Sequence, residues 1–144
     1  MNAETVRDAM VPEPTTLLAG ASAQEAGRCF ADSDDVRAIF VTEDSGRLLG
    51  VVTRKTLVRE VVAAGREPTG VTLSEIAEPP HFTLDAGLEL EAAFRFLEEH
   101  DLERVPVVEA EGRLVGVLSR AVVQRRLAED EPSEGEPEAD SLVL

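Results

Sequence analysis

Apolar and polar positions follow the same order twice along this 144-residue chain. Residues 36–61 read VRAIFVTEDSGRLLGVVTRKTLVREV, and residues 102–127 read LERVPVVEAEGRLVGVLSRAVVQRRL. Pairs of identical residues are separated by a constant 66 positions: Gly46/Gly112, Arg47/Arg113, Leu48/Leu114, Gly50/Gly116, Val51/Val117 and Arg54/Arg120. Identity at one fixed offset indicates that a single structural unit occurs twice.

Within each copy, the pattern predicts a short strand, an amphipathic helix, a β-hairpin and a second helix. Leu90, Ala93, Phe94 and Leu97 recur at helical spacing in the second copy, which predicts one apolar helix face. The short strands are expected near Leu17 and Leu84. Both copies therefore predict the same supersecondary unit.

Turn and cap residues support these elements. The β-rich runs 38–42 and 47–52 enclose an acidic turn that ends in Gly46, and Gly112 ends the matching turn of the second copy. Glycine suits the positive φ that such turns often require. Capping boxes are predicted at Ser22 with Glu25 and at Thr72 with Glu75, which places a helix start after each hydroxyl residue; Ser22 and Thr72 are the expected N-caps.

Two such units would each be marginal alone, because a three-stranded sheet with two helices buries little surface. We therefore expect an α/β (α+β) fold in which two pseudo-symmetric repeats pack sheet against sheet. The Gly and Pro residues of segment 66–71 and its flanks predict a linker between a first repeat at 1–65 and a second at 72–128. The acidic segment 129–144 is expected to be a disordered tail that folding does not need.

Composition excludes several kinds of partner. The net charge of -15 repels phosphate backbones and anionic membranes, and a chain with no Trp or Tyr offers few surfaces for base stacking. The sequence has neither a signal-peptide apolar run nor a stretch of roughly 18 apolar residues that could span a membrane. We expect a cytoplasmic protein that binds neither nucleic acid nor membrane.

Catalytic chemistry is also unsupported. His81 and His100 are the only histidines, and the single Cys29 lies in the other repeat. The sequence offers no nucleophile beside a base and no zinc-ligand spacing. We predict a protein without enzymatic activity, catalytic residues or a metal site.

The end of each hairpin carries the most specific motif. Residues 50–53 read GVVT and residues 116–119 read GVLS, each directly before a predicted helix, while residues 104–108 read RVPVV and residues 6–12 read VRDAMVP. Together these segments resemble the CBS-domain (cystathionine-β-synthase domain) family over residues 5–128. The resemblance implies a tandem CBS pair, or Bateman module.

The resemblance also implies a ligand. Members of the family commonly bind adenine nucleotides or adenosyl ligands between the paired repeats, so AMP, ATP or an adenosyl compound is the expected cofactor. Thr53 and Ser119 match the family's hydroxyl residue before the helix. At this place the backbone N–H groups and the dipole of the helix start can also bind an anion. A hydroxyl residue at this place can alternatively serve only as an N-cap. The remaining matched residues are the phosphate-reaching Arg104 and the early-strand Thr16 and Thr83.

The sequence departs from the family pattern at the ribose-binding aspartate. Thr56 and Val122 occupy that position; Val122 accepts no hydrogen bond, and Thr56 is a weaker acceptor than a carboxylate. The first copy departs further, with Ala38 opposite Arg104 and Phe40 in place of a proline. We expect the cleft around Thr83, Arg104 and Ser119 to be the better site, with weak adenine-nucleotide binding.

Two functions follow from this pattern. The first is a regulatory module that senses an adenine nucleotide or a related anionic ligand and acts on a partner protein. The second is a ligand-free scaffold that forms a homodimer through the helices of its repeats, because isologous dimers are the commonest oligomers. The retained hydroxyl and arginine residues favour the sensor, and the missing ribose acceptors favour the scaffold.

Overall fold

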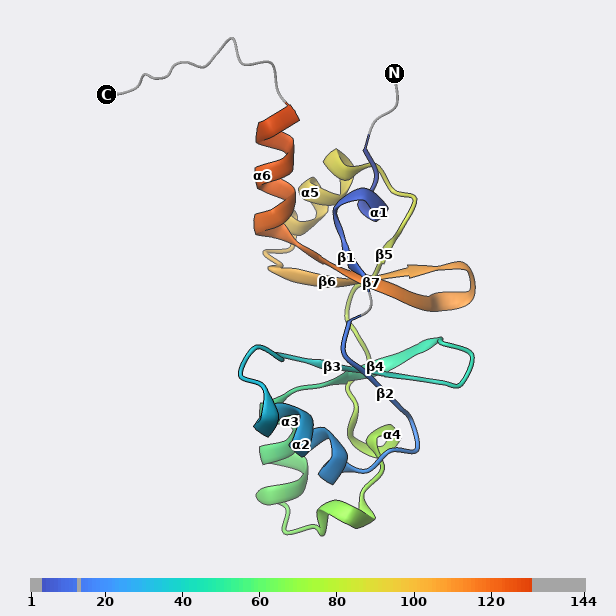
Figure 1. Cartoon of the computed structure of the whole chain (residues 1–144), viewed down its shortest axis with the longest axis vertical. Coiled ribbons are helices and arrows are strands. Elements are labelled where there is room, and N and C mark those ends of the chain that lie inside the picture. The colour runs from blue at the N-terminus through green and yellow to red at the C-terminus, as the bar shows by residue number, and fades with distance from the viewer. Residues whose placement is uncertain (1–3, 13, 131–144) are drawn as a thin grey trace, which may run out of the picture.

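The first repeat forms a three-stranded sheet in a computed structural model that describes residues 4–12 and 14–130. Its strands are β2 (Thr16–Leu18), β3 (Ile39–Thr42) and β4 (Leu48–Val52), in the order β2-β3-β4, with β2 parallel to β3 and β4 antiparallel. Helices α2 (Ala23–Asp32) and α3 (Arg54–Leu57) lie beyond this sheet, as Figure 1 shows. A π-helical turn, Val58–Val62, continues α3, and a 3-10 turn, Pro68–Gly70, precedes the short α4 (Leu73–Ile76).

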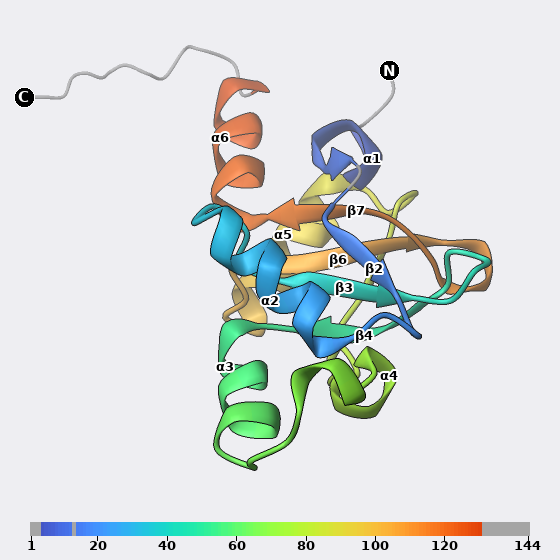
Figure 2. The same cartoon turned by 60° about the horizontal axis from the view of Figure 1, so that its bottom comes forward.

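The second repeat has the same order of elements. Its strands are β5 (Leu84–Asp85), β6 (Arg104–Glu109) and β7 (Arg113–Ser119), with a 3-10 turn at Ala110–Gly112 in the hairpin. Helices α5 (Leu90–Glu99) and α6 (Arg120–Asp130) pack beyond the sheet. Figure 2 shows the helices of the two repeats on opposite outer sides of the paired sheets. The predicted fold class, two repeats packed sheet to sheet, is confirmed.

Local sequence signals form the helices as expected. The Ser22 hydroxyl accepts a hydrogen bond from the Glu25 backbone N–H at 3.2 Å, and the Glu25 carboxylate accepts one from the Ser22 N–H at 2.9 Å. At the start of α4, the backbone N–H of Thr72 donates to Glu75 at 3.1 Å. This bond, together with one from Arg66, lowers the pKa of the Glu75 carboxyl. Both capping boxes are confirmed.

The hairpin turns also follow the prediction. Gly46 and Gly112 have φ values of 93° and 76°, a region that L side chains rarely adopt. The two turns meet, since Arg47 and Arg113 form a bridge between the sheets and the Leu114 N–H donates to the Gly46 carbonyl at 3.0 Å. The repeats are thus joined by main-chain hydrogen bonds at the hairpin ends.

Each repeat is completed by the segment that leads into the other. Helix α1 (Val6–Ala9) and strand β1 (Val11–Pro12) precede the sheet of the first repeat, yet β1 pairs with β7, at the edge of the order β1-β7-β6-β5. The Val6 N–H donates to the Leu88 carbonyl at 2.8 Å, and Val6 and Ala9 lie in the core of the second repeat.

The exchange is reciprocal. Leu73 and Ile76 of α4 lie in the core of the first repeat, and the Val51 N–H donates to the Glu78 carbonyl at 2.8 Å. The boundaries 1–65, 66–71 and 72–128 stay a prediction along the sequence, while in space each core takes in part of the segment before the other repeat.

This exchange explains the glycine of the repeated motif. A Cβ at Gly50 would lie 2.8 Å from the Glu78 carbonyl oxygen, and one at Gly116 would lie 2.8 Å from the Val11 carbonyl oxygen. Both distances are shorter than real Cβ contacts, so the crossing backbone requires a glycine in each strand.

The C-terminal helix runs beyond the predicted repeat. Helix α6 extends to Asp130 and so includes the first two residues of the predicted tail 129–144. Residues 131–144 lie outside the described residues. Over residues 4–12 and 14–130, no helix is long and apolar enough to cross a membrane.

Candidate ligand-binding cleft

A cavity of about 590 Å³ lies between the two repeats. Its apolar wall combines equivalent residues of the two sheets: Phe40 with Pro106, and Val51 with Val117. Phe40, which stands in place of a proline in the first copy, is 8% exposed and forms part of this shared wall. The repeats therefore enclose one common space, and its volume falls in the usual range for small-molecule sites.

The second repeat contributes two of the sequence-predicted residues to this cavity. Arg104 and Ser119 both line it, and they face each other as partners in the β6–β7 ladder. The Ser119 hydroxyl accepts a hydrogen bond from the Val122 N–H at 3.5 Å, so it caps α6. Its own O–H can still donate, because a hydroxyl carries both a donor and acceptor sites. The structure thus brings a guanidinium, a hydroxyl and a helix start together.

A second arginine in the lining was not predicted. Arg37 precedes β3 and lines the cavity from the first repeat. Within the described residues, the guanidinium groups of Arg37 and Arg104 make no hydrogen bond or ion pair, whereas those of Arg7, Arg113 and Arg120 each pair with a carboxylate. Two uncompensated guanidinium groups favour an anionic ligand, since a planar guanidinium matches carboxylate and phosphate oxygens.

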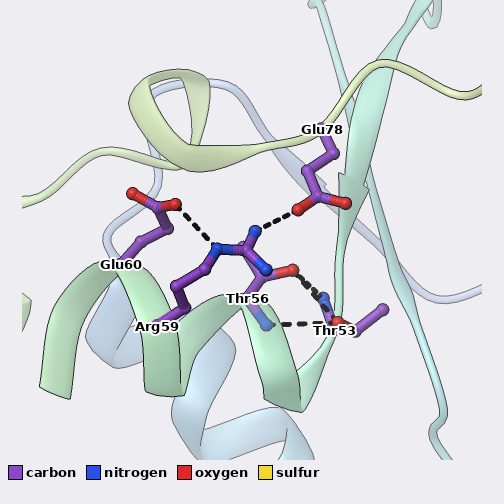
Figure 3. A network of polar contacts seen from close by, with 5 residues as sticks. All are labelled: Thr53, Thr56, Arg59, Glu60 and Glu78. Carbon is purple, nitrogen blue, oxygen red and sulfur yellow. Dashed lines mark hydrogen bonds and ion pairs between the residues drawn. The ribbon is translucent and has the colours of Figure 1, made fainter. Parts of the chain in front are cut away.

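The equivalent hydroxyl residues of the first repeat are arranged differently. The Thr53 N–H donates to the Thr56 hydroxyl at 3.0 Å, the Thr56 N–H donates to the Thr53 hydroxyl at 3.2 Å, and the hydroxyls lie 3.0 Å apart (Figure 3). Thr56 is 2% exposed, and neither residue lines the cavity. These hydroxyl groups cap α3. That Thr53 and Thr56 contact a ligand stays a prediction, and the cavity lining does not support it.

A charged network covers this cap. Figure 3 shows the Arg59 guanidinium between the carboxylates of Glu60 and Glu78. The hydrogen bond to Glu60 has the largest effect and the one to Glu78 the next largest, and both raise the pKa of Arg59. Because Glu78 also lines the cavity, its negative charge there is compensated by Arg59.

The early-strand threonines lie outside the cavity lining. Thr16 and Thr83 are exposed, and the residues before them, Thr15 and Phe82, line the cavity instead. Successive residues of a strand point to opposite faces, so a shift of one position changes which residue meets the cleft. That Thr16 and Thr83 contact a ligand remains a prediction.

Possible metal ligands do not cluster in the described part of the chain. His81 lines the cavity, but no three His, Cys, Asp or Glu side chains in that part of the chain gather closely enough to hold a metal ion.

Comparisons with known proteins identify the repeats. The model of the CBS domain matches residues 6–63 and again residues 73–129. Hypoxic response protein 1 of Mycobacterium tuberculosis is 33% identical over 131 residues, which cover 87% of this chain and 86% of that protein.

Solved structures agree. The crystal structure of Hypoxic Response Protein I with two coordinated zinc ions superposes with a TM-score of 0.71 at 30% identity, covering 85% of this chain and 98% of that one. The crystal structure of CBSX2, a CBS-pair protein from Arabidopsis thaliana, in complex with AMP superposes with a TM-score of 0.68 at 26% identity, covering 87% and 96%.

Proposed function

This chain belongs to the CBS-domain family, and on that premise we propose that it is a non-enzymatic regulatory module that binds an anionic adenine nucleotide or adenosyl ligand between its repeats. The uncompensated guanidinium of Arg104 beside the Ser119 hydroxyl is the observation that carries this proposal. The AMP complex of CBSX2 supports the choice of ligand class. The regulated partner protein and the cytoplasmic location stay predictions.

The proposed site holds the phosphate better than the ribose. Val122 stands half-buried at the start of α6, three residues after Ser119, and offers no acceptor to a ribose hydroxyl. A missing hydrogen bond to a charged acceptor weakens binding about 10-fold to 100-fold. AMP should therefore bind the unmodified protein more weakly than a variant that carries a carboxylate at position 122.

The experiment restores the missing acceptor. Val122→Asp should strengthen AMP binding by about 10-fold or more in a calorimetric or NMR titration, because a carboxylate then accepts from the ribose. Adding Arg104→Ala should remove that gain, since the phosphate loses its guanidinium. If Val122→Asp binds no nucleotide, the cleft is structural and the proposal fails.

A homodimer is the second candidate function, and one surface favours it. Val58 and Val62 are 57% and 72% exposed and lie one turn apart on the π-helical segment, while their counterparts in α6 are Gln124 and Ala128. An apolar pair on an outer helix suits an isologous contact with a second copy of this chain. Light scattering should give a dimer mass that falls towards the monomer for Val58→Lys/Val62→Lys; a monomer at high concentration in the unmodified protein would contradict it.

A further inference from the structure

One carboxylate in the cavity lining has no partner among the residues that the structure describes. The acidic residues of the lining are Asp35 and Glu78, and Arg59 pairs with Glu78. Asp35 is exposed, and the described part of the chain supplies it with neither a hydrogen bond nor an ion pair. Asp35 is therefore the lining carboxylate that is available to a ligand.

The two repeats treat the equivalent aspartates differently. Asp101 stands 66 positions after Asp35 and pairs with Arg120 at 3.5 Å; Arg120 also binds Glu103 at 2.5 Å. Arg54, the counterpart of Arg120, stacks its guanidinium 4.9 Å from the centre of the Phe30 ring. In the first repeat the arginine is thus used elsewhere, and the aspartate stays free.

The same arginine fixes the backbone around Asp35. Arg54 donates to the carbonyl oxygens of Ser33 and Val36 at 3.2 Å and 2.8 Å, on either side of Asp35, and to that of Phe30 at 3.0 Å. These bonds hold the loop without consuming the Asp35 side chain. A loop whose backbone is already held needs less ordering when a ligand binds, which favours affinity.

From this arrangement we infer that Asp35 is a specificity-determining residue: it accepts hydrogen bonds from a hydroxyl or amine group of the ligand whose anion binds at Arg104 and Ser119. The inference rests on the proposed function and deepens it. The first repeat supplies the acceptor, the second supplies the anion site, and the apolar wall with Phe40 and Pro106 lies in the same cavity. The ligand class it selects carries an anion and a separate donor, such as a sugar diol.

The test compares AMP with 2′,3′-dideoxy-AMP, which keeps the phosphate and lacks the diol. In NMR titrations, the unmodified protein should prefer AMP by about 10-fold or more, since charge-assisted hydrogen bonds are lost with the diol. Asp35→Ala should abolish this preference, because alanine has no acceptor, and it should not weaken the binding of dideoxy-AMP. Asp34→Ala is the matched control, because Asp34 is an exposed neighbour outside the cavity lining, and it should keep the preference.

The outcomes separate the two levels of the proposal. If Asp35→Ala still prefers AMP, or if Asp34→Ala loses the preference as well, the assignment of Asp35 is wrong while nucleotide binding stands. If the unmodified protein binds the two nucleotides equally well, Asp35 does not hydrogen-bond to the diol and the assignment is again wrong. If it binds neither of them, the proposed function and the assignment fail together.

Discussion

The two repeats share one backbone plan, but their hydroxyl residues before the second helix do different work. In the first repeat, the Thr53 and Thr56 hydroxyls bond to each other at 3.0 Å and Thr56 is 2% exposed. In the second repeat, Ser119 lines the cavity beside Arg104, and Val122 leaves no reciprocal hydroxyl to occupy it. The same motif can therefore be a helix cap in one copy and a cap with a ligand surface in the other.

The glycine of this motif has the same role in both copies. Gly50 and Gly116 each admit the backbone of a segment that belongs to the other repeat. The glycine of the repeated motif is thus needed for packing in both copies, whereas ligand binding depends on the residues around the motif.

The largest expected loss of stability comes from adding a side chain at Gly50 or Gly116, where another backbone segment crosses the strand. Gly50→Ala should destabilise the protein by about 1–3 kcal/mol, because the new Cβ meets the Glu78 carbonyl at 2.8 Å and the Ala77 Cβ at 2.9 Å. Gly116→Ala should cost less, since two of its three close atoms belong to the flexible Met10 side chain. Urea denaturation measures both, with Gly20→Ala as the control because no atom lies within 4 Å of its Cβ. A neutral Gly50→Ala would mean that the exchanged segment is loosely packed.

The next effect concerns the helix cap. Thr56→Val should destabilise the protein by about 1 kcal/mol, because the Thr53 N–H loses its acceptor at the start of α3. The reverse exchange in the second repeat, Val122→Thr, should change stability by no more than about 0.5 kcal/mol. Thermal unfolding of both variants checks the difference. Equal losses would show that the two caps are equivalent after all.

The smallest effect is stabilising. Gly27 lies inside α2 with open space around its Cβ, whereas the equivalent residue of α5 is Ala93. Gly27→Ala should therefore raise the free energy of unfolding by about 0.5–1 kcal/mol, since alanine has the higher helix propensity. A loss of stability in urea denaturation would show that α2 needs the glycine for a reason other than space.

The fold was predictable because its signals are local and occur twice. The hairpin runs 38–42 and 47–52 correspond to β3 and β4, and the capping residues Ser22 and Thr72 start α2 and α4. The apolar helix face was also right: Leu90, Ala93 and Leu97 are buried, and Phe94 packs against the same core.

The exchange of lead-in segments could not be read from these patterns. The contact between Val11 and Val117 joins residues far apart in sequence, and neither residue type specifies its partner. The nearest signal was the glycine at 50 and at 116, which marks a close backbone approach without naming what approaches.

The site was predictable only in part for a similar reason. Arg104 and Ser119 follow from the motif, and the structure brings them to the cavity. Arg37 and Asp35 lie in the loop before β3, where no periodicity tells which side chains meet the cleft. The only signal in the sequence for Arg37 and Asp35 was weak: both are charged residues shortly before a strand expected to face the cleft.

The claim that the ligand anion binds beside Arg104 in the second repeat, and not at Thr53 in the first, is tested most directly by one NMR titration. AMP is added to the unmodified protein, to Arg104→Ala and to Thr53→Ala, and each variant's dissociation constant is compared with that of the unmodified protein. We expect Arg104→Ala to weaken AMP binding about 10-fold or more, because a charge-assisted hydrogen bond to the phosphate is lost. Thr53→Ala should leave the dissociation constant within about 2-fold, since Thr53 does not line the cavity. An unchanged Arg104→Ala, or an equal loss in Thr53→Ala, would contradict the claim.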